Sequence, residues 1–188
     1  DMMSLSSHKI HGPNGMGGLF VKHGTKINPI VFGGNQEKGL RSGTENIASA
    51  AAFAKAATIK LSNLEPDCQK VLDLKNRLKC GLIQTIEKVI INSPENSVCT
   101  ILNVSFPGVK SEVLLHVLES KGIYVSTGSA CNSRKKKYSY VLGEMGLKDN
   151  VIDSAVRFSL SAFNTQEEID YTIEVLKKEI PILRKIMK

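Results

Sequence analysis

The sequence predicts a mixed fold of the α/β to α+β class, in which helices pack on a sheet. Two stretches, residues 98–106 and 155–160, alternate between apolar and polar side chains as strands do. Two others, 66–88 and 165–183, carry apolar residues at helical spacing. Strand-like and helix-like segments interleave along 188 residues, which is enough for one ordinary domain or for a large and a small one.

The first quarter of the chain is glycine-rich loop and strand. Its short apolar run at 18–21 suits a strand. From Glu45 an alanine-rich run predicts a helix, and Thr44 is expected to be its N-cap. No strand or helix precedes this glycine-rich segment in the sequence, so we expect the chain to be a fragment, truncated on its N-terminal side.

The middle of the chain alternates helix and strand. A helix is expected over 66–88, followed by a turn at 92–96 and the strand at 98–106. Ser111 is expected to cap the next helix, which ends near Lys121-Gly122.

The last third predicts a strand, a loop, a second strand and a closing helix. The strand is expected at 123–125, and residues 126–137 lack any periodicity, as in an exposed loop. In the strand at 155–160, Arg157 faces away from the apolar side. Thr165 to Glu168 matches a capping box at the start of the closing helix.

Composition limits the classes of function. No apolar run reaches the roughly 20 residues that span a bilayer, and the first residues lack a signal-peptide pattern, so no membrane partner and a cytoplasmic location are expected. The four cysteines are scattered, which predicts neither a disulfide framework nor a metal site. A net charge of +7 with 5% aromatic residues favours a solvated basic surface over a nucleic-acid site.

The first segment that suggests chemistry is Ser6-Ser7-His8-Lys9, which glycines follow closely. A lysine amine can form a Schiff base with an aldehyde cofactor, while hydroxyl and amide donors bind a phosphate on that cofactor. An exposed turn lysine without a chemical role is the alternative.

The second segment runs from Gly33 to Asn46, where a glycine-rich loop leads into a helix N-terminus. Such a terminus is a natural anion site. Ordinary turn chemistry with an N-cap explains the same residues equally well.

The third segment places Cys131 among small residues, just before the cations Arg134 to Lys137. Nearby cations favour the reactive thiolate, which makes Cys131 a candidate nucleophile. The other three cysteines lie in helical or strand patterns and are expected to be inert.

In this order, the three segments resemble the cysteine desulfurases, pyridoxal-phosphate (PLP) enzymes of fold type I in the class V aminotransferase family. The closest resemblance is to group I, which serves iron-sulfur cluster assembly. The resemblance places the cofactor lysine on Lys9 and phosphate contacts on Ser6 and His8, with Ser7 beside them as a further candidate cofactor-binding residue. A phosphate contact supplied across a homodimer falls on Thr44.

The same resemblance makes Cys131 the catalytic cysteine and Arg157 the residue that holds the substrate carboxylate, which agrees with its outward position on the strand. It implies that L-cysteine becomes L-alanine while Cys131 takes up sulfur as a persulfide for a sulfur-acceptor or iron-sulfur scaffold protein. Cys131 could also share a cluster on such a scaffold. The resemblance further implies that residues 1–60 are the end of a large PLP-binding domain and 61–188 the small C-terminal domain.

Two other functions fit parts of the sequence. A related PLP aminotransferase or selenocysteine lyase would share Lys9 and Arg157, although Cys131 favours sulfur chemistry. A non-catalytic module that only docks a scaffold protein is the third reading. The group's PLP-ring partners precede the lysine, so this chain alone is expected to be inactive and to lack bound PLP.

Overall fold

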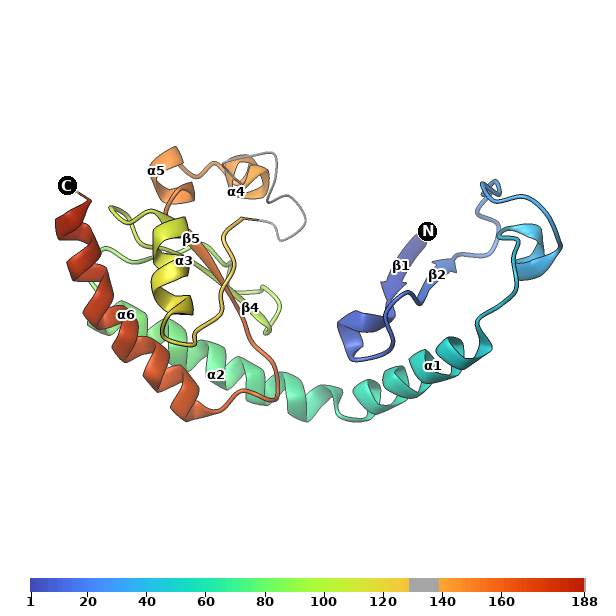
Figure 1. Cartoon of the computed structure of the whole chain (residues 1–188), viewed down its shortest axis with the longest axis horizontal. Helices are drawn as coiled ribbons and strands as arrows, with labels where there is room; N and C mark the ends of the chain where they lie inside the picture. Colours follow the sequence, from blue (N-terminus) through green and yellow to red (C-terminus); the bar gives the residue numbers. More distant parts are fainter. Residues whose placement is uncertain (129–138, 188) are drawn as a thin grey trace. The chain divides into compact units, whose positions relative to one another are not determined.

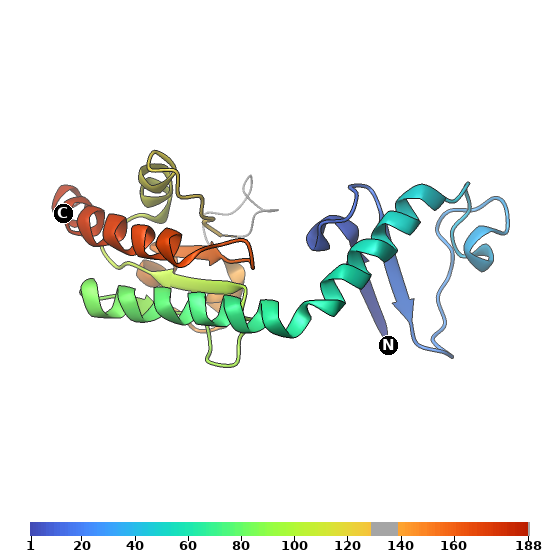
Figure 2. The same cartoon turned by 90° about the horizontal axis from the view of Figure 1, so that it is seen from below.

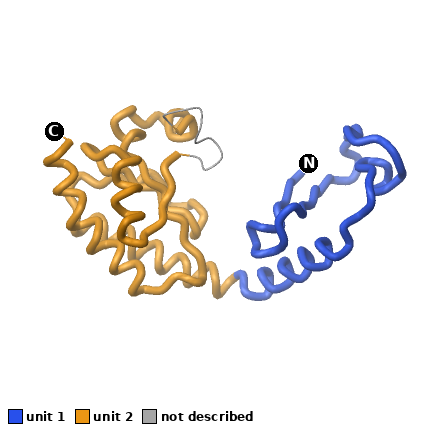
Figure 3. Tube along the Cα trace, viewed as in Figure 1, with its two compact units in different colours: residues 1–64 blue, residues 65–188 orange. Residues whose placement is uncertain are grey.

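A computed structural model describes residues 1–128 and 139–187; residues 129–138 and 188 lie outside the described part. The chain divides into two compact units, Asp1–Leu64 and Glu65–Lys188 (Figure 3). In the described residues, every helix is too short or too polar to cross a bilayer.

The first unit is built on a two-stranded antiparallel sheet (Figure 1). Strand β1 (Met2–Ser6) pairs with β2 (Gly17–Val21), and the short 3-10 helix η1 (Ser7–Ile10) follows β1 directly. A second 3-10 helix, η2 (Gln36–Gly39), precedes helix α1 (Ile47–Ser62). The strand expected at 18–21 is therefore confirmed, and it has a partner strand that the sequence pattern did not reveal.

No hydrophobic side chain within residues 1–64 is buried. The two strands expose Met2, Met3, Leu19 and Phe20, each more than half accessible. Two strands alone are marginally stable in water. Exposed apolar surface of this kind is typical of a sheet that packs against another segment or another protein.

Helix α1 begins at a different cap from the one predicted. The Asn46 side chain accepts a hydrogen bond from the backbone N–H of Ser49 at 3.1 Å, so Asn46 is the N-cap and the expectation for Thr44 was wrong. Asparagine is at least as good an N-cap as threonine. Asn46 is used here because it lies three residues before Ser49, whose N–H its side chain reaches.

The second unit contains a three-stranded antiparallel sheet in the order β3 (Ile90–Ile91), β4 (Ile101–Ser105) and β5 (Ala155–Ser159). One face of the sheet is apolar: Leu102 pairs with Phe158 and Val104 with Val156, and all four are buried. The alternation predicted for 98–106 and 155–160 is therefore confirmed, with both strands shorter than the patterns.

Helices α2 (Leu64–Thr85) and α6 (Gln166–Ile186) run side by side along this unit, and their apolar stripes join the same core as the sheet (Figures 1 and 2). Helix α3 (Ser111–Glu119) adds Leu114 and Leu118 to that core. Its cap is Lys110 instead of the predicted Ser111, which occupies the first helical position.

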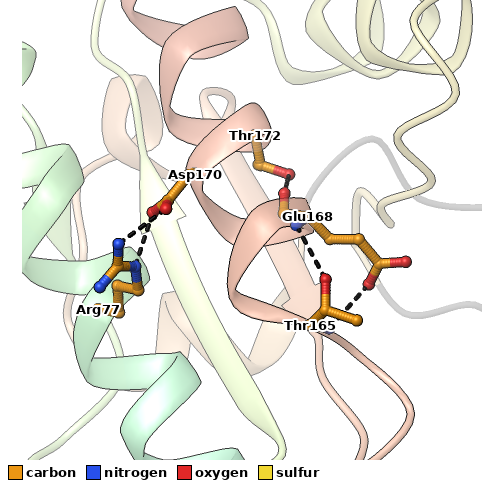
Figure 4. A network of polar contacts seen from close by, with 5 residues as sticks. All are labelled: Arg77, Thr165, Glu168, Asp170 and Thr172. Carbon is orange, nitrogen blue, oxygen red and sulfur yellow. Dashed lines mark hydrogen bonds and ion pairs between the residues drawn. The ribbon is translucent and has the colours of Figure 1, made fainter.

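Two polar contacts fix α6 (Figure 4). At its start, Thr165 Oγ1 accepts from the Glu168 backbone N–H at 3.3 Å, and Glu168 Oε2 accepts from the Thr165 N–H at 3.2 Å, so the predicted capping box is confirmed. Further along, Arg77 Nε and an Nη of α2 donate to both carboxylate oxygens of Asp170, at 2.6 and 2.7 Å.

On the opposite face of the sheet, two short helices pack against β5. The short helices α4 (Tyr140–Glu144) and α5 (Asp149–Ile152) place Leu142 and Ile152 against Ala155 of β5. The strand predicted at 123–125 is absent; instead Ser126 alone forms a bridge with Arg157. Short β-branched runs favour strands, but pairing depends on reaching a sheet edge, and here only the residue after the run does so.

Candidate active site

Lys9 lies in η1, on a turn that backbone hydrogen bonds hold at both ends. The Ser7 N–H donates to the Met16 carbonyl, and the Gly12 N–H donates to the Ser7 carbonyl, both at 3.0 Å. The turn ends at His11, in the left-handed region with φ 65°. The result is a short, closed loop between β1 and β2 on which the side chains of His8 and Lys9 are exposed.

The Ser7 hydroxyl occupies the inside of the same turn. It is fully buried, and Ser7 Oγ has no hydrogen-bond partner within the described residues. A Cβ built on Gly12 would lie 2.1 Å from Ser7 Oγ, so glycine is the residue that leaves room for this serine. Of the three predicted neighbours of Lys9, Ser6 and His8 therefore have accessible side chains and Ser7 does not.

Thr44 follows a glycine-rich loop that is folded onto itself. The Ser42 hydroxyl donates to the Gly34 carbonyl at 2.7 Å, and the Gly43 N–H donates to Gln36 Oε1 at 3.3 Å. Thr44 is exposed directly after this closed loop. The side chain is thus free to contact a group outside its own unit.

The residues around Lys9 fit the PLP group that the sequence implies. An exposed amine lies next to an accessible hydroxyl and an imidazole, on a turn too tight for a side chain at Gly12. These are the nucleophile and the donors that an aldehyde phosphate requires. Ser6, His8 and Lys9 would hold the group here.

Arg157 lies on β5 in the second unit, facing away from the apolar core as predicted. Its backbone exchanges two hydrogen bonds with Ser126, N–H to carbonyl at 2.8 Å and carbonyl to N–H at 3.1 Å. Arg157 Nε is buried and lacks a hydrogen-bond partner among residues 1–128 and 139–187. None of the ion pairs seen in these residues involves Arg157. A guanidinium with free N–H donors can bind a carboxylate through two parallel hydrogen bonds.

Sequence reasoning missed two asparagines: Asn103, which lies opposite this arginine, and Asn92, which is bonded to Asn103. Asn103 of β4 pairs in register with Arg157, and Asn92 donates from Nδ2 to Asn103 Oδ1 at 2.7 Å. Asn103 occupies an outward position of its strand, as Arg157 does, so the period-two pattern already placed both on one face. What the sequence could not supply was the register between the strands.

Cys131, the predicted nucleophile, lies outside the described residues, five positions after Ser126. Among the cysteines that the structure describes, Cys68 and Cys99 are half-buried and Cys80 is exposed. Burial, and then a hydrogen bond with Cys68, raise the pKa of the Cys99 thiol, which disfavours its thiolate.

A pocket of about 340 Å³ lies elsewhere in the second unit, between residues 122–125 and the start of α6. Its polar lining includes Ser159, Asn164 and Glu168, while Leu78 and Phe158 of the core form its floor. Arg157 does not line it. The carboxylate-binding candidate and this pocket are therefore separate features.

Comparisons with known proteins agree with the fold. The family described as aminotransferase class-V matches residues 1–172. The chain is 43% identical over 99% of its length to "Cysteine desulfurase IscS" of Buchnera aphidicola, and 40% identical over 96% to the enzyme of that name in Clostridium botulinum. A solved "NIFS-LIKE PROTEIN" is 35% identical, with a TM-score of 0.85 over 97% of this chain and 47% of that one.

The chain covers 46% of each of these two desulfurases, so it spans about half the length of the relatives that it matches. This agrees with the exposed sheet of the first unit, whose apolar side chains lack cover. The likeness to the NifS-like structure confirms the predicted mixed fold as part of a fold type I PLP enzyme. By the match over residues 1–172, the chain belongs to the class-V aminotransferase family.

Proposed function

We propose that the complete protein to which this chain belongs is a PLP-dependent cysteine desulfurase. In the reaction, L-cysteine and the Cys131 thiol give L-alanine and a persulfide on Cys131. The relatives that match the chain along nearly all its length carry the name cysteine desulfurase, which favours this reaction over an aminotransferase or a selenocysteine lyase.

The observation that carries the proposal is the bridge between Arg157 and Ser126. Arg157, whose guanidinium has no carboxylate partner among residues 1–128 and 139–187, lies on the strand that pairs with Ser126, and Cys131 follows Ser126 by five residues in the sequence. An anchor for an amino-acid carboxylate and the start of a thiol-bearing segment thus share one pair of residues. An attack on the side chain of a bound amino acid needs the carboxylate anchor and the nucleophile close together, and this sequence proximity supports the proposal.

Each residue then has one task. Arg157 holds the α-carboxylate and so fixes which way the substrate side chain points. Lys9 moves the proton at the substrate Cα; its amine is exposed on a turn that two backbone hydrogen bonds close. When bound, PLP supplies the electron sink for the charge that develops at Cα.

The sulfur step is a displacement at the substrate sulfur. The Cys131 thiolate attacks that sulfur, an S–S bond forms and the substrate Cβ–S bond breaks. The electron pair of the broken bond stays with the carbon fragment, which takes up a proton to become alanine. Atoms and electrons balance without an external oxidant, since the product persulfide carries the sulfur that alanine lacks.

Four further roles complete the proposal. Ser6 and His8 bind the cofactor phosphate, and Thr44 reaches the phosphate of a second copy in a homodimer. A sulfur-acceptor protein receives the persulfide sulfur. The cations Arg134 to Lys137 give that acceptor's docking site a positive charge, which suits an acidic partner.

The test uses the complete protein with Cys131→Ser and, as matched control, Cys80→Ser, because Cys80 is an exposed thiol outside the proposed site. We expect Cys131→Ser to abolish alanine release from L-cysteine and persulfide labelling, while bound PLP is retained. Cys80→Ser should leave both activities at the wild-type level. Unchanged alanine release by Cys131→Ser would contradict the proposal.

A further inference from the structure

Four residues lie in one row across the second unit. Ser126 bridges to Arg157 of β5, Arg157 pairs with Asn103 of β4, and the Asn92 N–H donates to the Asn103 carbonyl at 2.9 Å. Asn103 and Arg157 share the sheet face opposite the core, since their strand neighbours are the buried Leu102, Val104, Val156 and Phe158. The row therefore runs from Ser126, five residues before Cys131 in the sequence, across β5 and β4 to Asn92, which directly follows the edge strand β3.

Residues opposite each other in antiparallel strands form either hydrogen-bonded or non-hydrogen-bonded pairs, and Asn103 and Arg157 form a non-hydrogen-bonded pair. The backbone N–H and carbonyl of Arg157 both bond to Ser126. Those of Asn103 point the other way, where the N–H donates to Ser93 Oγ at 2.8 Å and the carbonyl accepts from Asn92. In a pair without mutual backbone hydrogen bonds the Cα atoms are typically about 4.5 Å apart and the side chains approach each other most closely. The Asn103 and Arg157 side chains thus leave the same face of the sheet at directly opposed positions.

The orientation of that amide follows from one hydroxyl. Ser105 Oγ donates its only hydrogen to the Val151 carbonyl at 2.8 Å, so it must accept from Asn92, whose Nδ2 lies 2.7 Å away. Nδ2 of Asn92 also donates to Asn103 Oδ1. The acceptor atom of Asn103 is therefore committed to Asn92, and its donor, Nδ2, is left for the side of Arg157.

Two donor groups at opposed positions on one face of a sheet can share an acceptor. Guanidinium and amide N–H groups cannot bond each other, and no carboxylate of residues 1–128 or 139–187 pairs with Arg157. Arg157 Nε is buried without a hydrogen-bond acceptor within the described residues, so at least one donor of the guanidinium still lacks a partner there. A carboxylate has two oxygens and about four lone-pair sites, so it can accept from both residues at once.

We propose that Asn103 Nδ2 and the Arg157 guanidinium together form the subsite for the substrate α-carboxylate, with Asn92 and Ser105 as positioning residues that set the polarity of Asn103. The inference deepens the proposed function and rests on it for the identity of the substrate. It assigns to Asn103 a contact with substrate and to Asn92 a role one hydrogen bond behind it.

The decisive variant is Asn103→Asp in the complete protein, because it replaces the donor by a carboxylate that pairs with Arg157 and competes with the ligand. Asn96→Asp is the matched control, since it adds the same charge at an exposed position of the same unit. Binding of L-alanine and of ethylamine, which differ in the carboxylate, is measured by titration calorimetry on the PLP-loaded protein.

We expect Asn103→Asp to weaken L-alanine binding by roughly ten- to a hundredfold, the effect of losing charge-assisted hydrogen bonds. Ethylamine binding should change less than about twofold, because the amine contacts remain. Asn96→Asp should bind both as the wild type does. Equal losses for the two ligands, or no loss for L-alanine, would overturn the subsite, since a merely structural role affects both alike.

A second variant tests the polarity. Asn92→Asp cannot donate to Asn103, so the Asn103 amide turns and presents Oδ1 to Arg157, which then has an internal acceptor. L-alanine binding should weaken here as well, and unchanged binding would remove Asn92 from the proposal. If the wild type binds L-alanine selectively but releases none from L-cysteine, the proposed function fails while the subsite stands.

Discussion

The turn that carries Lys9 offers a prediction that the structure makes quantitative. Gly12→Ala introduces a Cβ that would lie 2.1 Å from Ser7 Oγ, 3.2 Å from the Ser7 carbonyl oxygen and 3.3 Å from Ser7 Cβ. Ordinary contacts of this kind lie at 3.4–4 Å. The turn must therefore open by more than an ångström at the hydroxyl, and the Gly12 N–H bond to the Ser7 carbonyl is the contact placed at risk.

The size of the effect follows from which atom causes the clash. Overpacking of this kind costs about 1–3 kcal/mol. Ser7→Ala removes the hydroxyl and leaves only the contacts at 3.2 and 3.3 Å, which a shift of a few tenths of an ångström relieves. In that background Gly12→Ala should cost below about 1 kcal/mol, so the two substitutions couple by about 1–2 kcal/mol. Ser7→Ala alone should stabilise the turn by about 1 kcal/mol, since it removes a buried hydroxyl without a partner.

Native-state amide exchange at position 12 measures this locally, because the N–H concerned belongs to the turn itself. Gly12→Ala should speed exchange by about tenfold for each 1.4 kcal/mol lost. Gly143→Ala is the control, as a Cβ there meets nothing within 4 Å. Equal acceleration by Gly12→Ala with and without Ser7→Ala would refute the reasoning, since the hydroxyl would then not be the obstacle.

Three further outcomes follow from the second unit. Pro181→Ala should raise the free energy of unfolding by about 1–3 kcal/mol in urea titrations, because proline inside α6 removes a helical hydrogen bond; a lower value would contradict this. The hydrogen bond from Arg77 lowers the pKa of Asp170, so this pair stabilises the fold above the unfolded pKa of about 3.9, and the contribution disappears as the pH falls through the lowered value. Asp170→Asn should therefore flatten the acid limb of thermal unfolding, and an unaltered limb would exclude the pair as its cause. Thr165→Ala should cost about 1 kcal/mol by loss of the α6 cap, measurable as a lower urea midpoint; an unchanged midpoint would contradict a stabilising role for the cap.

Features set by neighbouring residues could be predicted from the sequence. The outward position of Arg157 follows from a period of two along a single strand, and the capping box at Thr165 needs only four residues. The cap of α1 shows the limit of local reasoning, because Thr44 and Asn46 are both suitable caps and only the backbone chooses between them.

Features set by pairing between distant residues could not be predicted. The run at 123–125 looks like a strand, yet Ser126 alone meets β5. In the same way, residues eleven positions apart, Asn92 and Asn103, have no recognisable spacing until β3 and β4 are placed side by side. Register is a tertiary property, and a shift by one residue would turn Asn103 to the core face.

The polar row also shows why its chemistry is hard to infer from residue types alone. An asparagine beside an arginine can present either its oxygen or its nitrogen, and the two choices predict opposite partners. Here the choice is made by Ser105, whose hydrogen is used on the Val151 carbonyl and whose oxygen is therefore an acceptor. The consequence passes through Asn92 to Asn103, so the group that faces Arg157 is decided by a buried hydroxyl two positions further along β4. The proposed carboxylate site would thus be specified jointly by the residues that touch the ligand and by a serine that does not.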